Sequence, residues 1–182
     1  MPTGGSEPTG GSAPPGGSAP PGGSASARGG AAPRAAAPRT LPTAGWREWV
    51  ALPDLGIGRI KAKLDTGARS SALHAYHVKY VRRGGRRIVR FRVHPVQRDQ
   101  EHFVEAEGEW LGERRVRSSS GAVSVRPVIR TALELGGERW SMELTLTRRD
   151  AMGFRLLLGR EALRGRCVVD PGRSFLTGKR RA

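Results

Sequence analysis

Cysteine and long apolar runs are nearly absent from this sequence of 182 residues. Its one cysteine, Cys167, excludes an intramolecular disulfide and a zinc site built from cysteines. Cys167 begins the apolar run Cys-Val-Val, where we expect the thiol to act as a small buried hydrophobe. No apolar stretch approaches the roughly 20 residues that span a bilayer, and the N-terminus lacks the basic start and apolar centre of a secretory signal. We therefore expect a cytoplasmic protein with no membrane partner.

Aromatic residues make up 5% of the chain, and none of them lies in the first 44 residues. That stretch holds 9 of the 13 prolines and 10 of the 26 glycines, in crude repeats of Gly-Gly-Ser-Ala-Pro. Such a segment has nothing apolar to bury and behaves as a flexible tether. We predict a disordered tail over residues 1–44, one folded domain over residues 45–176 and a short basic end over residues 177–182.

Acidic residues and lysine are scarce beside arginine. The chain has 16 acidic and 32 basic residues, a formal net charge of +16, and 4 of the basic residues are lysine. All but +2 of this charge lies beyond residue 44, where it would attract an acidic polypeptide, a nucleic acid or an anionic surface. An arginine bias is equally typical of a GC-rich genome, so a solvated basic surface without a partner is the alternative.

Hydrophobic and polar residues alternate over four stretches, a period of two that is typical of β-strands with one buried face. These stretches are residues 60–64, 89–93, 129–135 and 140–146. Turn signals containing glycine separate them, at residues 83–85, 119–121 and 135–137. The Gly-Gly pair in the last of these predicts a tight hairpin, since glycine adopts the positive φ of primed turns. With one helical turn predicted at residues 160–164, the pattern favours an all-β fold, either a small closed barrel or a sandwich.

Three common catalytic motifs are incomplete. Residues 178–180, Gly-Lys-Arg, lack the earlier glycine and the hydroxyl that a P-loop requires. Residues 118–121, Ser-Ser-Ser-Gly, lack the flanking glycines of a nucleophile elbow and are typical of a hairpin tip. His74 and His77 are spaced to share a metal on a helical turn, but the H-E-x-x-H pattern of metalloproteases is missing.

The sequence Asp65-Thr66-Gly67-Ala68 directly follows an alternating strand. By itself Asp-Thr-Gly is most often a turn, because Asp bonds its own backbone and Gly tolerates left-handed geometry. Its context resembles the retroviral-type aspartic proteases, the retropepsins, which combine this loop with a glycine-tipped flap and with aliphatic residues before Gly-Arg and a short helix. The matching segments are residues 116–125 for the flap, 135–140 for the next hairpin, 156–163 for the aliphatic-Gly-Arg segment and 167–169 for the closing strand.

More closely, residues 45–175 resemble a bacterial retropepsin-like family whose members are often labelled ATP-dependent zinc proteases and are associated with ATP-grasp glutamate ligases. The likeness is carried by residues 63–75, 115–119 and 152–160. Neither a P-loop nor a zinc-protease motif accompanies them, whereas the aspartic-protease loop is complete. The resemblance therefore implies a small closed β-barrel of the retropepsin type and aspartic-protease chemistry, with no cofactor and no metal.

The resemblance also implies a role for each matching residue. Asp65 would supply the catalytic carboxylate. Its loop would be shaped by Thr66, Gly67 and Ala68 and supported by Leu157, Leu158 and Gly159. The flap over an extended polypeptide substrate would comprise Arg117, Ser118, Ser119, Ser120 and Gly121. Because this chemistry needs two carboxylates that share one proton and the chain has one Asp-Thr-Gly, we predict a homodimer in which each chain supplies Asp65.

One position departs from the viral pattern. There an acidic residue follows the loop alanine and pairs with the arginine of the Gly-Arg step. Here those two positions are Arg69 and Arg160, which cannot pair with each other. We expect Glu161 or another acidic residue to take the missing place.

The sequence therefore predicts a homodimeric aspartic endopeptidase. Its basic charge and the associated ligases favour an acidic, glutamate-rich polypeptide as the substrate. Two alternatives stay open. One is a non-catalytic module whose basic face binds an acidic polypeptide or a nucleic acid, and the other is a zinc-dependent peptidase that uses His74 and His77.

Overall fold

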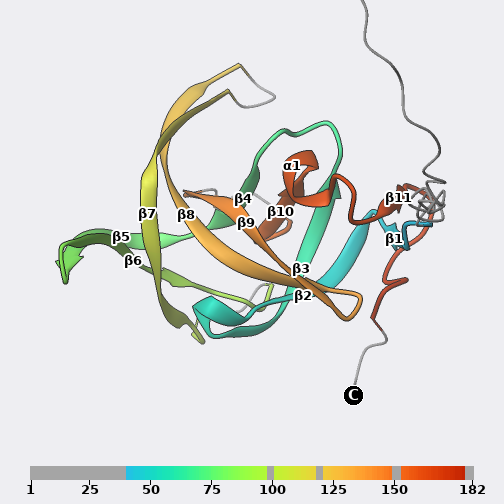
Figure 1. Ribbon diagram of the computed structural model, residues 1–182, viewed down its shortest axis with the longest axis horizontal. Coiled ribbons are helices and arrows are strands. Elements are labelled where there is room, and N and C mark those ends of the chain that lie inside the picture. Colours follow the sequence, from blue (N-terminus) through green and yellow to red (C-terminus); the bar gives the residue numbers. More distant parts are fainter. Residues whose placement is uncertain (1–39, 98–100, 118–120, 149–152, 179–182) are drawn as a thin grey trace, which may run out of the picture. The chain divides into compact units, whose positions relative to one another are not determined.

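The computed structural model describes residues 40–97, 101–117, 121–148 and 153–178, almost all of them in strands or tight turns (Figure 1). The strands are β1 (Thr43–Gly45), β2 (Arg47–Leu52), β3 (Ile57–Asp65), β4 (Ser71–His74), β5 (Tyr76–Arg83), β6 (Arg86–Val93), β7 (Val104–Arg117), β8 (Val123–Leu135), β9 (Glu138–Thr147), β10 (Leu156–Gly159) and β11 (Val168–Asp170). A 3-10 turn, Pro53–Leu55, follows β2, and the helix α1 (Arg160–Leu163) follows β10. The predicted all-β class with one short α-helix is confirmed for the part of the chain that is described.

Six strands close into a barrel, in the order β2-β3-β10-β4-β9-β8. The ring closes where Ala51 of β2 pairs with Glu134 of β8. Beyond β8 the same sheet continues outward through β7, β6 and β5, which lie outside the ring. Closure removes the exposed strand edges of the six ring strands, which stabilises a small sheet. The closed barrel predicted from the sequence is confirmed, and the sandwich is not formed.

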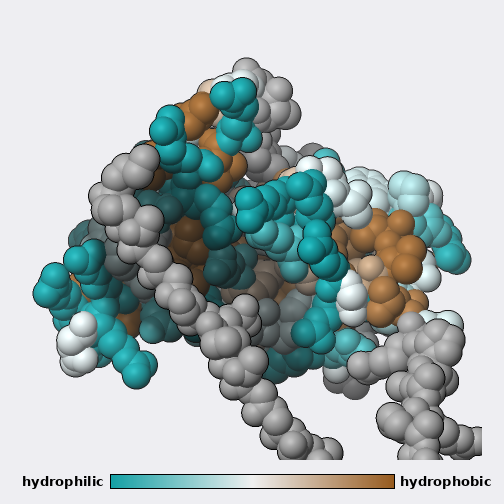
Figure 2. Space-filling model, turned by 45° about the horizontal axis from the view of Figure 1, so that its top comes forward, coloured by the Kyte–Doolittle hydropathy of each residue, from teal (hydrophilic) through white to brown (hydrophobic). Residues whose placement is uncertain are grey.

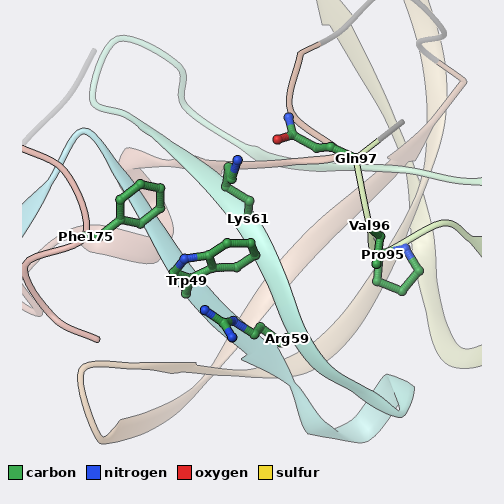
Figure 3. Close-up of a pocket in the computed structure, with 7 residues that line it drawn as sticks. All are labelled: Trp49, Arg59, Lys61, Pro95, Val96, Gln97 and Phe175. Atoms are coloured by element: carbon green, nitrogen blue, oxygen red, sulfur yellow. The ribbon is translucent and has the colours of Figure 1, made fainter. Parts of the chain in front are cut away.

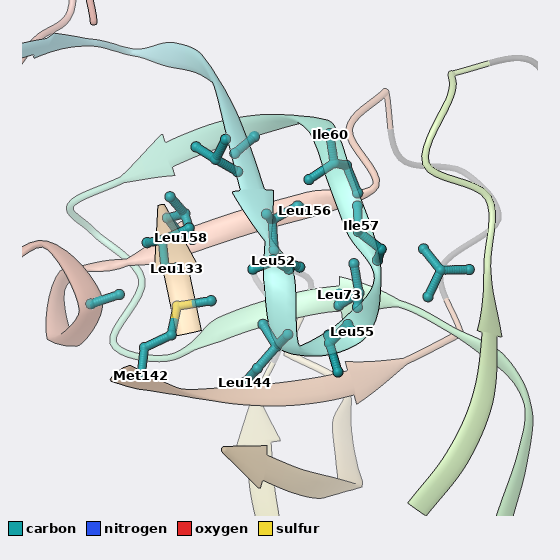
Figure 4. Close-up of a cluster of buried hydrophobic side chains, with 14 of the residues drawn as sticks. Leu52, Leu55, Ile57, Ile60, Leu73, Leu133, Met142, Leu144, Leu156 and Leu158 are labelled. Carbon is teal, nitrogen blue, oxygen red and sulfur yellow. The ribbon is translucent and has the colours of Figure 1, made fainter. Parts of the chain in front are cut away.

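The core fills the inside of this barrel, and its side chains come from alternate positions of the strands (Figure 4). On β3 the alternating residues Ile60, Ala62 and Leu64 are all buried, while the lysines between them are half-buried. The same alternation buries the inward residues of β6 and β9, which are Val89, Phe91, Val93, Trp140, Met142, Leu144 and Leu146. The period of two therefore predicted the buried faces correctly.

Two hairpins turn on the expected Gly-Gly pairs. Gly136 and Gly137 have φ of 63° and 85°, and Gly84 and Gly85 have φ of 55° and 76°. Two consecutive positive φ values define the primed turn whose twist matches that of paired strands, and glycine adopts them without steric cost. At the third expected turn Gly121 also has a positive φ, of 86°, while Ser118, Ser119 and Ser120 lie outside the described residues.

The first strand begins before the expected domain boundary. β1 pairs in parallel with β11, and Ala44, which the sequence analysis assigned to the tail, is fully buried. The carboxylate of Glu48 is buried beside it and accepts hydrogen bonds from the backbone N–H groups of Gly45 (2.7 Å), Leu176 (2.8 Å) and Thr177 (3.3 Å). The folded domain thus extends past the expected limits of 45 and 176 at both ends.

The helical turn predicted at residues 160–164 is α1. Its first turn is closed by the N–H of Arg164, which donates to the carbonyl of Arg160 at 2.9 Å, and Ala162 and Leu163 pack into the core. Gly165 follows with a φ of 68° and ends the helix. No helix in the described ranges is long and apolar enough to cross a membrane.

Candidate active site

Asp65 is the last residue of β3, at the point where that strand leaves the barrel. Its Oδ1 accepts hydrogen bonds from the backbone N–H groups of Gly67 (3.1 Å) and Ala68 (3.0 Å). The Nζ of Lys63 lies 3.8 Å from the other oxygen, Oδ2. The loop therefore bends back around the carboxylate and holds one oxygen in place, and Oδ2 keeps its lone pairs for other partners.

The strand β10 supports this loop from its buried side. It runs parallel to β3, with Leu157 opposite Lys63, Leu158 opposite Leu64 and Gly159 opposite Asp65. Both leucines are buried. Gly159 lies so close to the loop that an added Cβ would come within 2.7 Å of the carbonyl oxygens of both Arg69 and Ser70. A side chain at that position would push the loop away from the barrel.

Two hydroxyl groups tie the loop to its neighbours, and the sequence analysis missed both. The Oγ of Ser71 accepts a hydrogen bond from the N–H of Gly159 at 3.1 Å, and the Oγ1 of Thr145 donates to the carbonyl of Ser71 at 2.7 Å. Both side chains are buried. No spacing in the sequence indicates these contacts, because they join strands β4, β9 and β10, which are far apart along the chain.

Arg69 pairs with Glu161, the acidic residue that follows Arg160. Its Nε donates to Oε1 of Glu161 at 2.7 Å, and this hydrogen bond, with the nearby positive charge, lowers the pKa of the Glu161 carboxyl. Arg160 instead donates through Nη1 to the carbonyl of Gly67 at 3.2 Å. The backbone N–H of Arg160 also donates to the carbonyl of Ala68 at 2.8 Å. The start of α1 thus holds the Asp65 loop through side chains and backbone together.

The expected flap is the hairpin of β7 and β8, whose arms pair as far as Arg117 and Val123. Arg114 on the β7 arm donates through Nη1 to Oγ of Ser70 at 3.2 Å and forms an ion pair with Glu143. A second, longer ion pair joins Arg114 to Glu161 at 3.9 Å. The base of the flap is therefore connected to the loop beside Asp65.

Comparison with known proteins agrees with this geometry. The model of the RimB-like family, described as the retropepsin-like aspartic endopeptidase RimB, matches residues 43–180. The chain belongs to the RimB-like family. A solved structure of a Legionella pneumophila protein of unknown function is also similar, with a TM-score of 0.66 and 30% identity over 76% of this chain and all of the other.

Longer proteins share this RimB-like domain. A probable alpha-L-glutamate ligase of Shewanella halifaxensis is 43% identical over 135 residues, which are 74% of this chain and 30% of the ligase. A protein of the same name from Parasynechococcus marenigrum is 48% identical over 134 residues, which are 74% of this chain and 29% of that protein. The chain therefore spans about 30% of the length of these relatives.

The remaining predicted site residues of the RimB-like domain are placed less closely around Asp65. Thr66 is exposed at the tip of the loop. His74 is buried at the end of β4, and His77 is exposed on β5 with a φ of 52°, so the two lie on strands and do not share a helical turn. Within the described ranges, His, Cys, Asp and Glu side chains form no group of three or more that could hold a metal.

Cys167 packs partly against the core of the RimB-like domain and is half-buried. Burial, with the negative charges of Glu48 and Glu138 nearby, raises the pKa of its thiol. A thiol with a raised pKa is mostly protonated near neutral pH, and the thiolate is the nucleophilic form. Cys167 therefore fits the small hydrophobe expected from the sequence.

A cavity of about 750 Å³ lies elsewhere on the RimB-like domain, on the outer face of β2 and β3 (Figure 3). Trp49 stacks beside Phe175 with ring centroids 5.8 Å apart, and the Nζ of Lys61 lies 5.4 Å from the Trp49 centroid. The lining residues are Trp49, Arg59, Lys61, Pro95, Val96, Gln97 and Phe175. None of the predicted site residues lines this cavity, so its volume does not mark the Asp65 site.

Proposed function

We propose that this chain is an aspartic endopeptidase of the cytoplasm, whose active site forms where the Asp65 loops of two chains meet. The observation that carries the proposal is the way Asp65 is held. Its Oδ1 is bound by two backbone N–H groups of an Asp-Thr-Gly-Ala loop that β10 and α1 support from behind. Membership of a family described as retropepsin-like aspartic endopeptidases supports the same chemistry.

The reaction requires two carboxylates that share one proton. The ionised carboxylate takes a proton from water as the water oxygen attacks the scissile carbonyl, and the protonated one donates its proton to the carbonyl oxygen. Two carboxylates about 3 Å apart cannot both be ionised, so the pair retains one proton, as in known aspartic proteases. The pair titrates as a unit, and turnover should fall as its shared proton is lost at higher pH.

A second copy of the chain is needed to supply the second carboxylate. The sequence contains one Asp-Thr-Gly. Among the described residues, the recorded partners of the Asp65 carboxylate are the N–H groups of Gly67 and Ala68 and the Nζ of Lys63. Thr66 is exposed beside it, where its hydroxyl would contact the partner's loop across a twofold axis.

An extended, acidic polypeptide is the substrate that this site favours. On the β8 arm of the flap Val123 and Val125 are 49% and 58% exposed, which leaves an apolar strand surface for a substrate that adds by backbone hydrogen bonds. Three basic residues contact the loop or its Asp65, namely Lys63 on β3, Arg69 in the loop and Arg160 at the start of α1. The name of the relatives, alpha-L-glutamate ligase, supports a glutamate-rich chain as the acidic substrate.

The test is cleavage of a library of glutamate-rich, neutral and basic peptides by the wild type and by Asp65→Asn. The amide of asparagine cannot exchange the proton, so turnover should be abolished while circular dichroism shows an intact fold. Asp170→Asn is the matched control, because Asp170 ends β11, away from the Asp65 loop, and forms an exposed ion pair with Arg173 (2.7 Å). It should retain activity.

Three further measurements separate the alternatives. Sedimentation should show that Asp65→Asn still dimerises, since the substitution removes repulsion between two carboxylates. A chelator and the variant His77→Ala should leave cleavage unchanged, whereas a zinc peptidase would lose activity and regain it with metal. Full activity of Asp65→Asn would overturn the aspartic mechanism, and peptide binding without cleavage by the wild type would favour a binding module.

A further inference from the structure

The hairpin of β5 and β6 carries like charges directly opposite one another. We call its outer part, residues 79–90, the basic arm. Arg82 lies opposite Arg87 and Arg83 opposite Arg86, in the register next to the Gly84-Gly85 turn. Like charges in directly opposed positions destabilise an antiparallel pair of strands. Two consecutive pairs of this kind oppose folding of the arm unless anions come near them.

Acidic side chains of the described residues compensate Arg83, Arg90 and Arg92 of the hairpin. Residues 76–97 contain no Asp or Glu, and the compensating charges among the described residues come from β7. There Glu105 pairs with Arg92 (2.6 Å), and Glu107 pairs with Arg90 (2.6 Å) and Arg83 (3.1 Å).

At the tip, no ion pair is recorded for Arg82 or Arg86 among the residues that the structure describes. Both are exposed. In Figure 2 the surface on the left, where the hairpin lies in Figure 1, is mostly hydrophilic. The tip therefore presents guanidinium groups whose charge is available to an external anion.

Aromatic rings lie next to Arg82 and Arg87 on one face of the arm, while Arg86, which pairs with Arg83, lies on the other face. Tyr80 is 55% exposed, and the guanidinium of Arg87 lies 4.7 Å from the centroid of Trp110 on β7. Together with Arg82 and Glu113 these residues line a cavity of about 390 Å³. The indole Nε1–H of Trp110 is buried and has no acceptor within the described part of the chain. The cavity thus combines ring faces and two arginines with one carboxylate, that of Glu113, to which the hydroxyl of Tyr80 donates at 3.4 Å.

We propose that the basic arm binds single-stranded nucleic acid. Phosphate groups would contact Arg82 and Arg87, and one base would stack on Tyr80 at the mouth of the cavity beside Trp110. One guanidinium group can bind two phosphate oxygens at once, and proteins bind unpaired bases by stacking them on aromatic rings. A glutamate-rich peptide matches the charge but has no ring to stack. This surface shares no residue with the Asp65 loop, and the proposal does not depend on peptidase activity.

The test is fluorescence anisotropy of the full chain with labelled oligouridylate of about 12 nucleotides, a length that one small binding surface can cover. Arg82→Gln with Arg87→Gln should weaken binding at least tenfold. The slope of log affinity against log salt should fall by about 1.4, since each phosphate contact of a single strand contributes about 0.7. Circular dichroism should show this double variant folded, because the two substitutions remove like-charge repulsion.

The matched control removes the same charge elsewhere. Arg130 lies opposite Glu109 and Glu143 in register, and Arg164 is exposed after α1. Arg130→Gln with Arg164→Gln should change the affinity less than threefold. Tyr80→Leu should weaken binding by roughly tenfold, as expected for loss of one base stack, while Tyr80→Phe, which keeps the ring, should bind as the wild type does.

Three results would overturn the proposal. The first is equal weakening by the control pair, which would mean that net charge alone attracts the strand. The second is an oligoglutamate peptide of the same charge that binds as tightly as the oligonucleotide and is insensitive to Tyr80→Leu, which would assign the arm to acidic peptides. The third is a duplex that binds as tightly as the single strand, since paired bases are not free to stack. A parallel titration with an oligodeoxyribonucleotide of the same length shows whether the basic arm binds RNA or DNA.

Discussion

The Asp65 loop and the basic arm differ in whether their charged side chains have partners. At the loop, Asp65, Arg69 and Arg160 each have a hydrogen-bond partner within the domain. At the tip of the arm, arginine faces arginine across the turn. A catalytic carboxylate needs a fixed position, which close packing and backbone donors supply. A surface for a polyanion needs uncompensated charge instead, and an exposed hairpin outside the barrel can carry it at little cost to the core.

The largest expected effect comes from filling the space behind the Asp65 loop. Gly159→Ala would place a Cβ 2.6 Å from the backbone of Ser70 and 2.7 Å from the carbonyl oxygen of Arg69. Both contacts are to backbone atoms, which cannot move aside as the end of a flexible side chain can. We expect a loss of about 3 kcal/mol in the free energy of unfolding, measured by urea denaturation, together with loss of any peptidase activity. Gly58→Ala is the control, because nothing lies within 4 Å of its added Cβ. A Gly159→Ala variant as stable as the control would show that the loop is not packed against β10.

Removing one hydroxyl should have a smaller effect. Ser71→Ala leaves the N–H of Gly159 without its acceptor in a buried position. The expected cost is about 1.5 kcal/mol in the same urea experiment, the usual cost of one unsatisfied buried donor. Ser71→Thr keeps the hydroxyl and should recover part of the loss if the hydrogen bond, rather than the side-chain volume, is responsible. If Ser71→Ala were as stable as the wild type, the hydrogen bond from Gly159 to Ser71 would not stabilise the loop.

The ion pair of Arg69 and Glu161 is exposed, so Glu161→Gln should lower the free energy of unfolding by less than Ser71→Ala does. The Arg69 hydrogen bond lowers the pKa of Glu161 in the folded protein. Because the pKa of Glu161 is lower in the folded protein, its ion pair contributes fully to stability above the unfolded pKa of about 4.3. That contribution is lost as the pH falls through the folded pKa. Melting temperatures of wild type and Glu161→Gln should therefore differ at pH 6 and converge in strong acid. A difference that persists there would indicate a contribution other than charge.

The smallest effect is expected at the arm, and its sign should be reversed. Arg86→Gln removes one like-charge pair and should raise the free energy of unfolding by roughly a few tenths of a kcal/mol. Arg90→Gln on the same strand removes one of the two ion-pair partners of Glu107 and should lower the free energy of unfolding. If both variants lose stability, the arm is compensated at its tip as well as at its root, and the contrast with the Asp65 loop disappears.

Local features of the sequence predicted much of the fold. The period of two located the inward faces of β3, β6 and β9, and the Gly-Gly pairs located two hairpins, because side-chain direction and positive φ are properties of a few neighbouring residues. The sequence indicated Glu161 or another acidic residue in the missing place, and the structure pairs Arg69 with Glu161. The roles of Ser71 and Thr145 were missed, since nothing near them in the chain indicates a partner.

The sequence by itself determined that this chain forms strands with one apolar face, that two of its hairpins turn on glycine pairs, and that one Asp-Thr-Gly loop follows a strand. The tertiary structure alone decided which strands are neighbours: β10 beside β3, β4 beside β9, and β2 beside β8 to close the ring. It also decided that Glu161 faces Arg69, and that Glu48 binds both ends of the domain. The physical reason is that alternation specifies which side of a strand is buried, whereas the choice of neighbour depends on the combined packing of residues from the whole chain.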